Sequence, residues 1–319
     1  MTDLLKCVAL GLVSFLAVNA VASALTLAVS RFALRARARP AVRARALFAL
    51  RLFPSAAATL AVLLFFVPAY LAYEPLGSDE AVGLPLVGFA LLAGALLIAA
   101  ASRGLGSWRE TRRLARALEE GAERLDLPGV ALPAYRIRHP FPLVTVLGVR
   151  RPRLYVAEQV LAGLDDAERG AVFEHELAHV ASRDNLRHWL LHACPDLLPL
   201  FPGGDALTPA WLAAAEEAAD EVAARRAPLA ALDLAAALVK VARLVPPDQP
   251  AFLPALALHN GDDIARRVAR LLQGPSSAGE PRRTLWALAG LALLAGVPFY
   301  LPALRFAHGL TERLVAFLS

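Results

Sequence analysis

Four long apolar stretches constrain the fold of this chain more than any other feature. Apolar residue types make up 57% of its 319 residues, and charged types make up 19%. A helix of about twenty apolar residues crosses the hydrocarbon core of a bilayer, and four stretches reach that length: 8–29, 53–73, 82–101 and 285–304. The first ends in arginines instead of a small-residue cleavage site, so we interpret it as a span and not as a signal peptide. We therefore predict four transmembrane helices.

The arginines predict how these helices are oriented. The segment between the first two spans is rich in arginine, whereas the loop between the second and third, EPLGSDEA, has no basic residue. Arginines also follow the third span and precede the fourth. Because basic flanks stay in the cytoplasm, we predict external termini and a cytoplasmic segment 102–283. The arginines that indicate this orientation are Arg31, Arg35, Arg37, Arg39, Arg43, Arg45, Arg51, Arg103, Arg109, Arg112, Arg113, Arg116, Arg282 and Arg283. Four of them at helical spacing are expected to rest on the headgroups of membrane lipid: Arg109, Arg112, Arg113 and Arg116.

The basic residues also indicate the kind of organism that the sequence comes from and argue against nucleic acid as a partner. Only Lys6 and Lys240 are lysines, and this bias toward arginine indicates a bacterial coding sequence, and hence a bacterial inner membrane. The net charge of +5 is mild, and no basic stretch alternates with aromatic residues as in a groove that binds a nucleic-acid strand. We therefore expect no direct contact with nucleic acid.

The cytoplasmic segment has the pattern of a small α+β domain inserted between the third and fourth spans. A predicted amphipathic helix over 108–125 precedes three short runs, AYRIRH, LVTVLGV and RLYVA, which we predict to be strands. LVTVLGV is equally compatible with a strand paired on both sides and with an open edge on which a peptide substrate lies. The predicted organisation is three spans in 1–101, the domain in 102–283, and the last span with a short external tail in 284–319.

Four further helices are predicted after the strands. The first has Asp165 at its N-cap and Glu168 three residues later, which is a capping box. The second has Thr208 at its N-cap and Pro209 at its first position. The four helices cover 165–182 with an extension toward 195, 208–227, 229–244 and 262–272, and a flexible linker, 274–281, follows them.

The stretch FEHELAHVASRD, residues 173–184, has the pattern of a zinc hydrolase. His175 and His179 are four residues apart, so a helix places both imidazoles on one face, as two zinc ligands require. Glu176 lies beside them, where a carboxylate takes a proton from the attacking water and passes it to the leaving amine. We predict one zinc ion per chain, with Glu176 as the catalytic base. A surface helix with two solvated histidines is the alternative.

A third zinc ligand is expected from a second helix, since hydrolytic zinc sites have three protein ligands. The predicted helix after Thr208 contains EEAAD, in which Glu216 and Asp220 share one face. We predict that Glu216 is the third ligand and that Asp220 accepts a hydrogen bond from a ligand histidine. Glu217 points about 100° away from Glu216 on a helix and belongs, with Glu221, to a predicted solvated face.

These residues resemble a known family, the integral-membrane zinc peptidases of the Bla/Mec type, which include the β-lactam sensor-transducers. The block RRPRLYVAEQVLAGLDDAERGAVFEHELAHVASRDN is similar to the family's strand, helix and metal motif, and EEAAD is similar to its Glu-x-x-x-Asp element. Three predicted spans before the domain and one after it fit the family layout. The resemblance covers roughly residues 1–310, and its specific part is 152–227.

The resemblance implies a gluzincin-type zinc endopeptidase that faces the cytoplasm and cuts a protein substrate, such as a transcriptional repressor, in response to a signal. It also implies autocleavage near residues 274–283. Family sensors carry a penicillin-binding domain after the fourth span; this sequence ends at Ser319, so we do not expect that kind of β-lactam receptor. Quality-control and prenyl-protein membrane peptidases, which share both motifs, are an alternative. A non-catalytic membrane scaffold or receptor is an alternative from another class.

Several other residues have both a functional and a structural interpretation. Asp184, just after the motif, is expected either to support the metal-binding helix or to be a capping or surface carboxylate. His259 and Arg266 lie in a region similar to one where related membrane peptidases place a His and an Arg. Either is a candidate donor to the oxyanion of the tetrahedral intermediate. The structural alternative is that the histidine lies in a loop and the arginine is exposed to solvent. His188 and His192 are four residues apart in apolar surroundings, which predicts an interfacial helix or loop instead of a second metal site.

Overall fold

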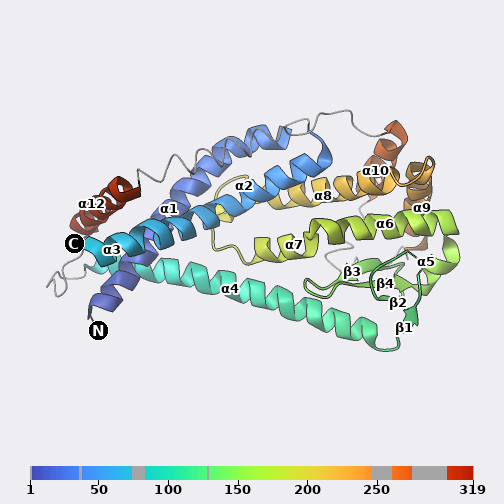
Figure 1. The fold of residues 1–319 in the computed structure, drawn as a ribbon, viewed down its shortest axis with the longest axis horizontal. Helices are drawn as coiled ribbons and strands as arrows, with labels where there is room; N and C mark the ends of the chain where they lie inside the picture. Colours follow the sequence, from blue (N-terminus) through green and yellow to red (C-terminus); the bar gives the residue numbers. More distant parts are fainter. Residues whose placement is uncertain are drawn as a thin grey trace.

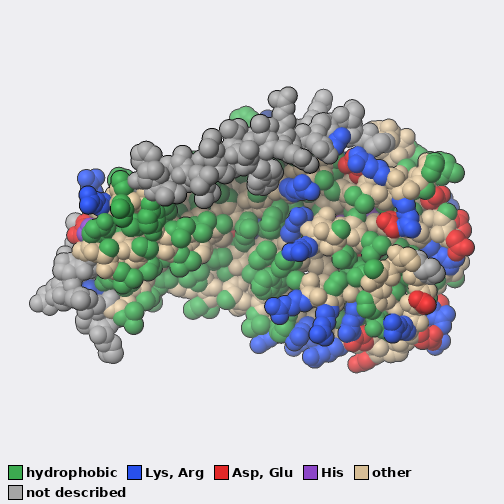
Figure 2. All heavy atoms as spheres, viewed as in Figure 1, with side chains coloured by type: hydrophobic (Ala, Val, Ile, Leu, Met, Phe, Trp, Pro, Cys, Tyr) green, Lys and Arg blue, Asp and Glu red, His purple; other side chains and the backbone are tan. Residues whose placement is uncertain are grey.

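Three long helices form one half of the molecule, and a small sheet with shorter helices forms the other half (Figure 1). The computed structural model describes residues 2–35, 38–73, 83–127, 129–245, 261–274 and 300–318. Within these residues, three helices are long and apolar enough to cross a membrane: Leu4–Arg35, Pro40–Tyr73 and Leu84–Glu119. They contain the first two predicted spans, 8–29 and 53–73, and residues 84–101 of the third. Hydrophobic side chains cover much of the surface of this half, and Lys and Arg gather where it meets the other half (Figure 2).

The first two of these helices extend well beyond the predicted spans. The first is α1 (Thr2–Arg35). The second consists of α2 (Pro40–Ala61), the π-helical η1 (Val62–Phe66) and α3 (Val67–Tyr73). The arginine-rich segment, predicted as a loop, is therefore mostly helical, because arginine favours helices and proline is accommodated in a first helical turn.

The third span and the predicted amphipathic helix 108–125 form one continuous helix, α4 (Leu84–Glu119). Gly104 does not interrupt it. A Cβ added there would lie 2.8 Å from the Cβ of Ala193, so this glycine allows the segment around Ala193 to approach the helix closely. The helix ends before Gly121, whose φ of 80° is left-handed. Residues Glu123–Leu125, predicted as the end of the helix, form strand β1 instead.

The three predicted strands are confirmed as β2 (Ala134–Ile137), β3 (Val144–Leu147) and β4 (Arg153–Ala157). With β1 they form a mixed sheet in the order β1-β2-β4-β3. β2 runs parallel to β4, whereas β1 and β3 run antiparallel to their neighbours. β3 is therefore an edge strand, which agrees with the second interpretation of LVTVLGV.

The sheet packs against helices that follow it in the sequence. Its buried side chains, among them Tyr155 and Val156, form one core with Phe173 of α6 (Asp166–Ser182) and Ala237 of α9 (Ala230–Leu244). The short helix α5 (Glu158–Gly163) joins β4 to α6. The predicted capping box at the start of α6 is confirmed, with both of its hydrogen bonds present.

The helix predicted over 165–182 ends at Ser182 as predicted, but its extension toward 195 is wrong, because α7 (Asp184–His192) follows as a separate helix. The predicted start of the next helix is also wrong. After the short η2 (Leu198–Leu200), α8 (Leu207–Ala224) has Ala206 as its N-cap. Thr208 is therefore not the cap, because its hydroxyl instead accepts a hydrogen bond of 3.2 Å from Nε of Arg51. The last two predicted helices are confirmed as α9 and α10 (Gly261–Gln273).

The connection between α7 and α8 is anchored to the first two long helices. Asn19 of α1, which is 0% exposed, donates to the Pro195 carbonyl at 2.9 Å and accepts from the Leu197 N–H at 3.1 Å. Arg51 of α2 forms a buried ion pair with Asp196. These polar contacts fix the start of α8, the helix that carries the predicted third ligand, against the half of the molecule that contains the spans.

The last described helix, α12 (Tyr300–Leu318), lies beside α3 (Figure 1), and the Tyr300 hydroxyl donates to the Leu64 carbonyl at 2.7 Å. The predicted tail, 305–319, is thus helical as far as Leu318. Most of the predicted fourth span, 285–304, and of the predicted linker, 274–281, lies outside the described residues, and so does His259. The fourth span and the domain boundaries remain predictions.

Candidate metal centre

The two histidines of the predicted metal motif face one another on α6. Their rings are perpendicular, with centroids 4.8 Å apart, and their Nε2 atoms are 3.2 Å apart. Burial is high, since the side chain of His175 is 9% exposed and that of His179 is 18% exposed. Two imidazole nitrogens directed at the same point can each donate a lone pair to one shared cation. This arrangement argues against the alternative of a helix with two solvated histidines.

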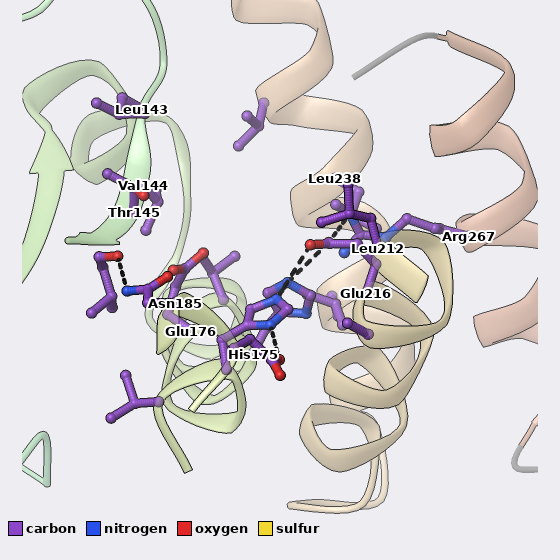
Figure 3. Close-up of a pocket in the computed structure, with 18 of the residues that line it drawn as sticks. Leu143, Val144, Thr145, His175, Glu176, Asn185, Leu212, Glu216, Leu238 and Arg267 are labelled. Carbon is purple, nitrogen blue, oxygen red and sulfur yellow. Dashed lines mark hydrogen bonds and ion pairs between the residues drawn. The ribbon is translucent and has the colours of Figure 1, made fainter. Parts of the chain in front are cut away.

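Glu216 of α8 completes the cluster. Its Oε2 lies 3.5 Å from Nε2 of His175, and its Oε1 lies 3.4 Å from Nε2 of His179. The ligand atoms of the three residues all lie within 4.8 Å of one another, and Figure 3 shows the Glu216 carboxylate directed at the histidines. Ligands about 2.0–2.1 Å from a tetrahedral zinc ion lie about 3.3 Å apart. The observed separations therefore fit zinc.

Each histidine is held from behind by a carboxylate. Nδ1 of His175 lies 2.9 Å from Asp220 on α8, and Nδ1 of His179 lies 2.9 Å from Asp184 at the start of α7. A metal-binding histidine commonly has such a partner, which fixes the tautomer and the ring orientation. Asp220 thus lies where the sequence predicts. Of the two interpretations of Asp184, its position supports the functional one.

The contact of Asp184 depends on the break between α6 and α7. Arg183 has φ 55° and ψ 39°, the left-handed conformation, and is the only non-glycine residue with positive φ among the described residues. This conformation turns the chain so that Asp184 returns toward His179. Asp184 also pairs with Arg187 at 3.1 Å. No feature of the local sequence marks Arg183 for this conformation, because glycine or asparagine is usual there.

The structure distinguishes Glu216 from Glu217. Glu217 points away from the histidines and forms ion pairs with Arg270 of α10 at 2.5 Å and with Arg43 of α2 at 3.6 Å. Its side chain is only 25% exposed, so it links α8 to two other helices and is not part of a fully solvated face. Glu221, predicted on that face, pairs with Arg225.

Glu176 lies beside the cluster, in a cleft between β3 and the helices. Burial raises the pKa of its carboxyl group, although the two neighbouring histidines lower it. The backbone of Val146 on β3 also lowers this pKa, but by less than burial raises it. A raised pKa favours the protonated form of the carboxyl group, which suits a group that both accepts and donates a proton.

The cleft has a volume of about 310 Å³. Residues of β3 form one wall and residues of α8 and α9 form the opposite wall, as the labels Val144, Leu212 and Leu238 in Figure 3 show. Apart from the metal cluster, its lining is mainly apolar; the other polar side chains are those of Thr145, Glu176, Asp184, Asn185, His188 and Arg267. Such a cleft, apolar with few convergent polar groups, is typical of a substrate site.

Arg267 of α10 is a site residue that the sequence reasoning missed. It donates two hydrogen bonds to Asp220, at 2.8 and 2.6 Å, and pairs with Glu216 at 3.0 Å. The candidate donor Arg266 is 73% exposed and pairs with Asp263, which agrees with the second interpretation, an exposed arginine. The helical pattern contained a signal for Arg267, because it lies four residues before Leu271, which packs in the core with residues of α6, α8 and α9, and so shares its face of the helix.

The charges of the cluster support one another. Burial lowers the pKa of both His175 and His179, but the contacts with carboxylates outweigh it, so both pKa values are raised. Burial likewise raises the pKa of Glu216, yet the histidines bring it well below its ordinary value. Asp220 also has a lowered pKa, because the contacts with His175 and Arg267 outweigh burial. The site thus favours charged carboxylates facing imidazoles that bind a proton or a metal.

His188 and His192 lie on α7 with ring centroids 4.5 Å apart, and His188 stacks on Trp211 at 6.1 Å. Burial, with a smaller contribution from His192, lowers the pKa of His188 to about 4. Among the described residues, the group of His, Cys, Asp and Glu side chains able to hold a metal is His175, His179 and Glu216.

Comparison with known families identifies the central part of the chain. Residues 109–245 match the family model of peptidase family M48. The match indicates a peptidase and is consistent with the membrane zinc peptidases of the gluzincin type that the sequence resembles; it does not distinguish the Bla/Mec type among them. A search of curated proteins found no match. With the three apolar helices, the family match indicates a membrane-associated metallopeptidase.

Proposed function

Because the segment that contains His175, His179 and Glu216 matches peptidase family M48, we propose that this chain is a membrane-anchored zinc endopeptidase. The observation that carries the proposal is the convergence of two Nε2 atoms and one carboxylate at separations of 3.2–3.5 Å. These residues would hold one zinc ion, with Asp184 and Asp220 fixing the two imidazoles.

Glu176 has the position and the protonation behaviour of the base. Zinc bound at this site would polarise the scissile carbonyl and the attacking water. Glu176 would accept the proton of that water and then pass it to the nitrogen of the leaving amine. Its raised pKa favours the second transfer, because burial favours the protonated form of the carboxyl group, which is the form that donates the proton. The mainly apolar cleft would exclude other water from the reacting groups.

The shape of the cleft supports a protein or peptide substrate. β3 is an edge strand along one wall, and an extended peptide adds to such an edge through main-chain hydrogen bonds. The arginines that gather between the two halves support a cytoplasmic position for the domain. We propose that the substrate is a cytosolic or membrane-proximal protein. A transcriptional repressor cut in response to a signal is the form of this proposal that the resemblance to the Bla/Mec type suggests.

The test uses the full chain, purified in detergent, with unfolded casein as substrate. We expect the zinc-loaded wild type to produce peptides that mass spectrometry identifies, and a chelator to abolish them. Glu176→Gln keeps the size of the side chain and should bind zinc while producing no peptides. The exposed Glu158→Gln is the matched control and should cleave like the wild type. Equal cleavage by wild type and Glu176→Gln would contradict the proposal.

A further inference from the structure

The hydrogen-bonding pattern of β3 defines which of its backbone groups face the cleft. In the antiparallel pair with β4, Thr145 lies opposite Tyr155 and Val144 opposite Val156. The Ala157 N–H donates to the Leu143 carbonyl at 2.8 Å, which identifies the odd-numbered positions of β3 as those bonded to β4. Since the direction alternates along a strand, the N–H and carbonyl groups of Val144 and Val146 point away from the sheet.

The carbonyl group of Val146 already has a partner. It accepts a hydrogen bond of 2.9 Å from Nδ2 of Asn185, marked by a dashed line in Figure 3. The same amide group also donates to the Gly148 carbonyl at 3.3 Å. Asn185 lies on α7, directly after Asp184, so the break at Arg183 positions both side chains. The outward carbonyl groups of β3 and of the residue after it, Gly148, are therefore occupied from Val146 onward.

Val144 is different, because no hydrogen bond of its outward N–H or carbonyl group to a described residue is observed, and it lines the cleft. Pro142, two residues earlier, has no N–H to donate. An added strand forms two hydrogen bonds at one residue and none at the next. Val144 is thus the one described position of this edge where an extended chain forms a complete pair of hydrogen bonds.

We propose that Asn185 is a positioning residue that sets the register of the substrate by closing the edge of β3 at Val146. The inference rests on the proposed peptidase function. A substrate chain pairs with Val144 through one residue and then leaves the strand at Val146, where Glu176 and the metal cluster lie. From Val144 to Val146 the distance is about 7 Å along a strand, so the paired residue lies about two residues from the scissile bond. The enzyme therefore requires a free backbone N–H at one substrate position.

The test measures this requirement with backbone-methylated peptides. A peptide of twelve residues is made around the casein bond that the wild type cuts fastest, with a single N-methyl group at each position in turn. Methylation removes one N–H and leaves the side chain intact. Beyond the residues of the scissile bond, we expect methylation at one position to lower kcat/KM by about tenfold or more, which corresponds to one lost hydrogen bond. The positions two residues to either side of it should tolerate the group.

The variants test whether Asn185 sets this pattern. In Asn185→Ala the Val146 carbonyl becomes available, so additional bonds two residues from the original site should be cut and a second methyl-sensitive position should appear. Asn185→Asp keeps the size and lacks the N–H donors, and it should behave like the alanine variant. The control Gln159→Ala removes another amide-to-carbonyl hydrogen bond, to Pro140, outside the cleft. It should retain the wild-type pattern.

Two results would overturn the inference. One is that N-methylation at several alternate positions of the peptide lowers cleavage by the wild type, which would mean that the edge of β3 is open beyond Val144. The other is an unchanged cleavage pattern in both Asn185 variants. Hydrogen exchange of the free protein, resolved to single amides, supplies a test that needs no cleavage: the Val144 amide should exchange quickly and the Thr145 amide, which faces Tyr155 of β4, slowly, and the reverse order would refute the open position. Absence of casein cleavage with the expected exchange rates would instead count against the peptidase function.

Discussion

Asp184 lies 2.9 Å from Nδ1 of His179, although the helix that carries the histidine ends between them. The left-handed residue at the break returns the chain, so a carboxylate from the next helix contacts the imidazole from behind. Asp220 contacts His175 at the same distance from a third helix. The two Nε2 atoms are thus directed at one point by contacts on the far side of each ring.

Replacing Asp184 should weaken metal binding without removing a ligand. Asp184→Asn keeps the shape of the side chain but loses the charge that holds the His179 N–H, and we expect zinc affinity to fall about 10–100-fold. Asp166→Asn, at a 96% exposed carboxylate in the first turn of α6, the helix that carries His179, is the matched control. Competition with a chromogenic chelator measures both. Equal affinities would show that the contact does not orient the ligand.

Arg267 and Arg266 are adjacent in sequence but differ in environment. Arg267→Ala leaves two buried carboxylates, Asp220 and Glu216, without their cation, and such a loss costs about 3–5 kcal/mol in the free energy of unfolding. Arg266→Ala removes an exposed ion pair and should change stability by less than about 1 kcal/mol. Thermal unfolding of the metal-free proteins in detergent compares them. Equal midpoints would contradict the assigned role of Arg267.

The backbone at Arg183 predicts an unusual tolerance of glycine. Glycine adopts a φ of 55° without a Cβ clash, so Arg183→Gly should preserve zinc binding and raise or maintain the unfolding midpoint. Arg183→Val places a β-branched residue in the same conformation and should cost about 1–2 kcal/mol. Thermal unfolding with zinc titration of both variants checks this. Greater harm from glycine than from valine would refute the left-handed conformation.

His188 should make the fold sensitive to acid. Its pKa is about 4 in the folded protein, below the ordinary histidine value of 6.5 that applies to the unfolded chain. Between these values the unfolded chain binds the extra proton, so the contribution of His188 to stability is complete above pH 6.5 and decreases as the pH falls toward 4. At about pH 5 the loss should be roughly 1–2 kcal/mol. We expect the difference in unfolding midpoint between wild type and His188→Gln to change in this direction from about pH 7.5 to about pH 5, and a constant difference would contradict it.

Local patterns in the sequence predicted the elements, and long-range contacts decided the rest. The spacing of His175, Glu176 and His179 and the capping box at Asp165 depend on residues within one helix, so both are readable from the sequence. The prediction of Thr208 as an N-cap was wrong because Arg51, 157 residues away, donates a hydrogen bond to its hydroxyl. Arg267 escaped notice for a similar reason: its partners lie on α8, and only the packing of α10 against that helix brings them together.

The central claim is that His175, His179 and Glu216 together hold one zinc ion. Zinc per chain, measured by elemental analysis of the purified full chain, tests it most directly when wild type, Glu216→Ala and Glu217→Ala are compared. The account predicts about one zinc in the wild type and in Glu217→Ala, and a large loss in Glu216→Ala. A wild type without zinc, or loss in the Glu217 variant alone, would contradict it.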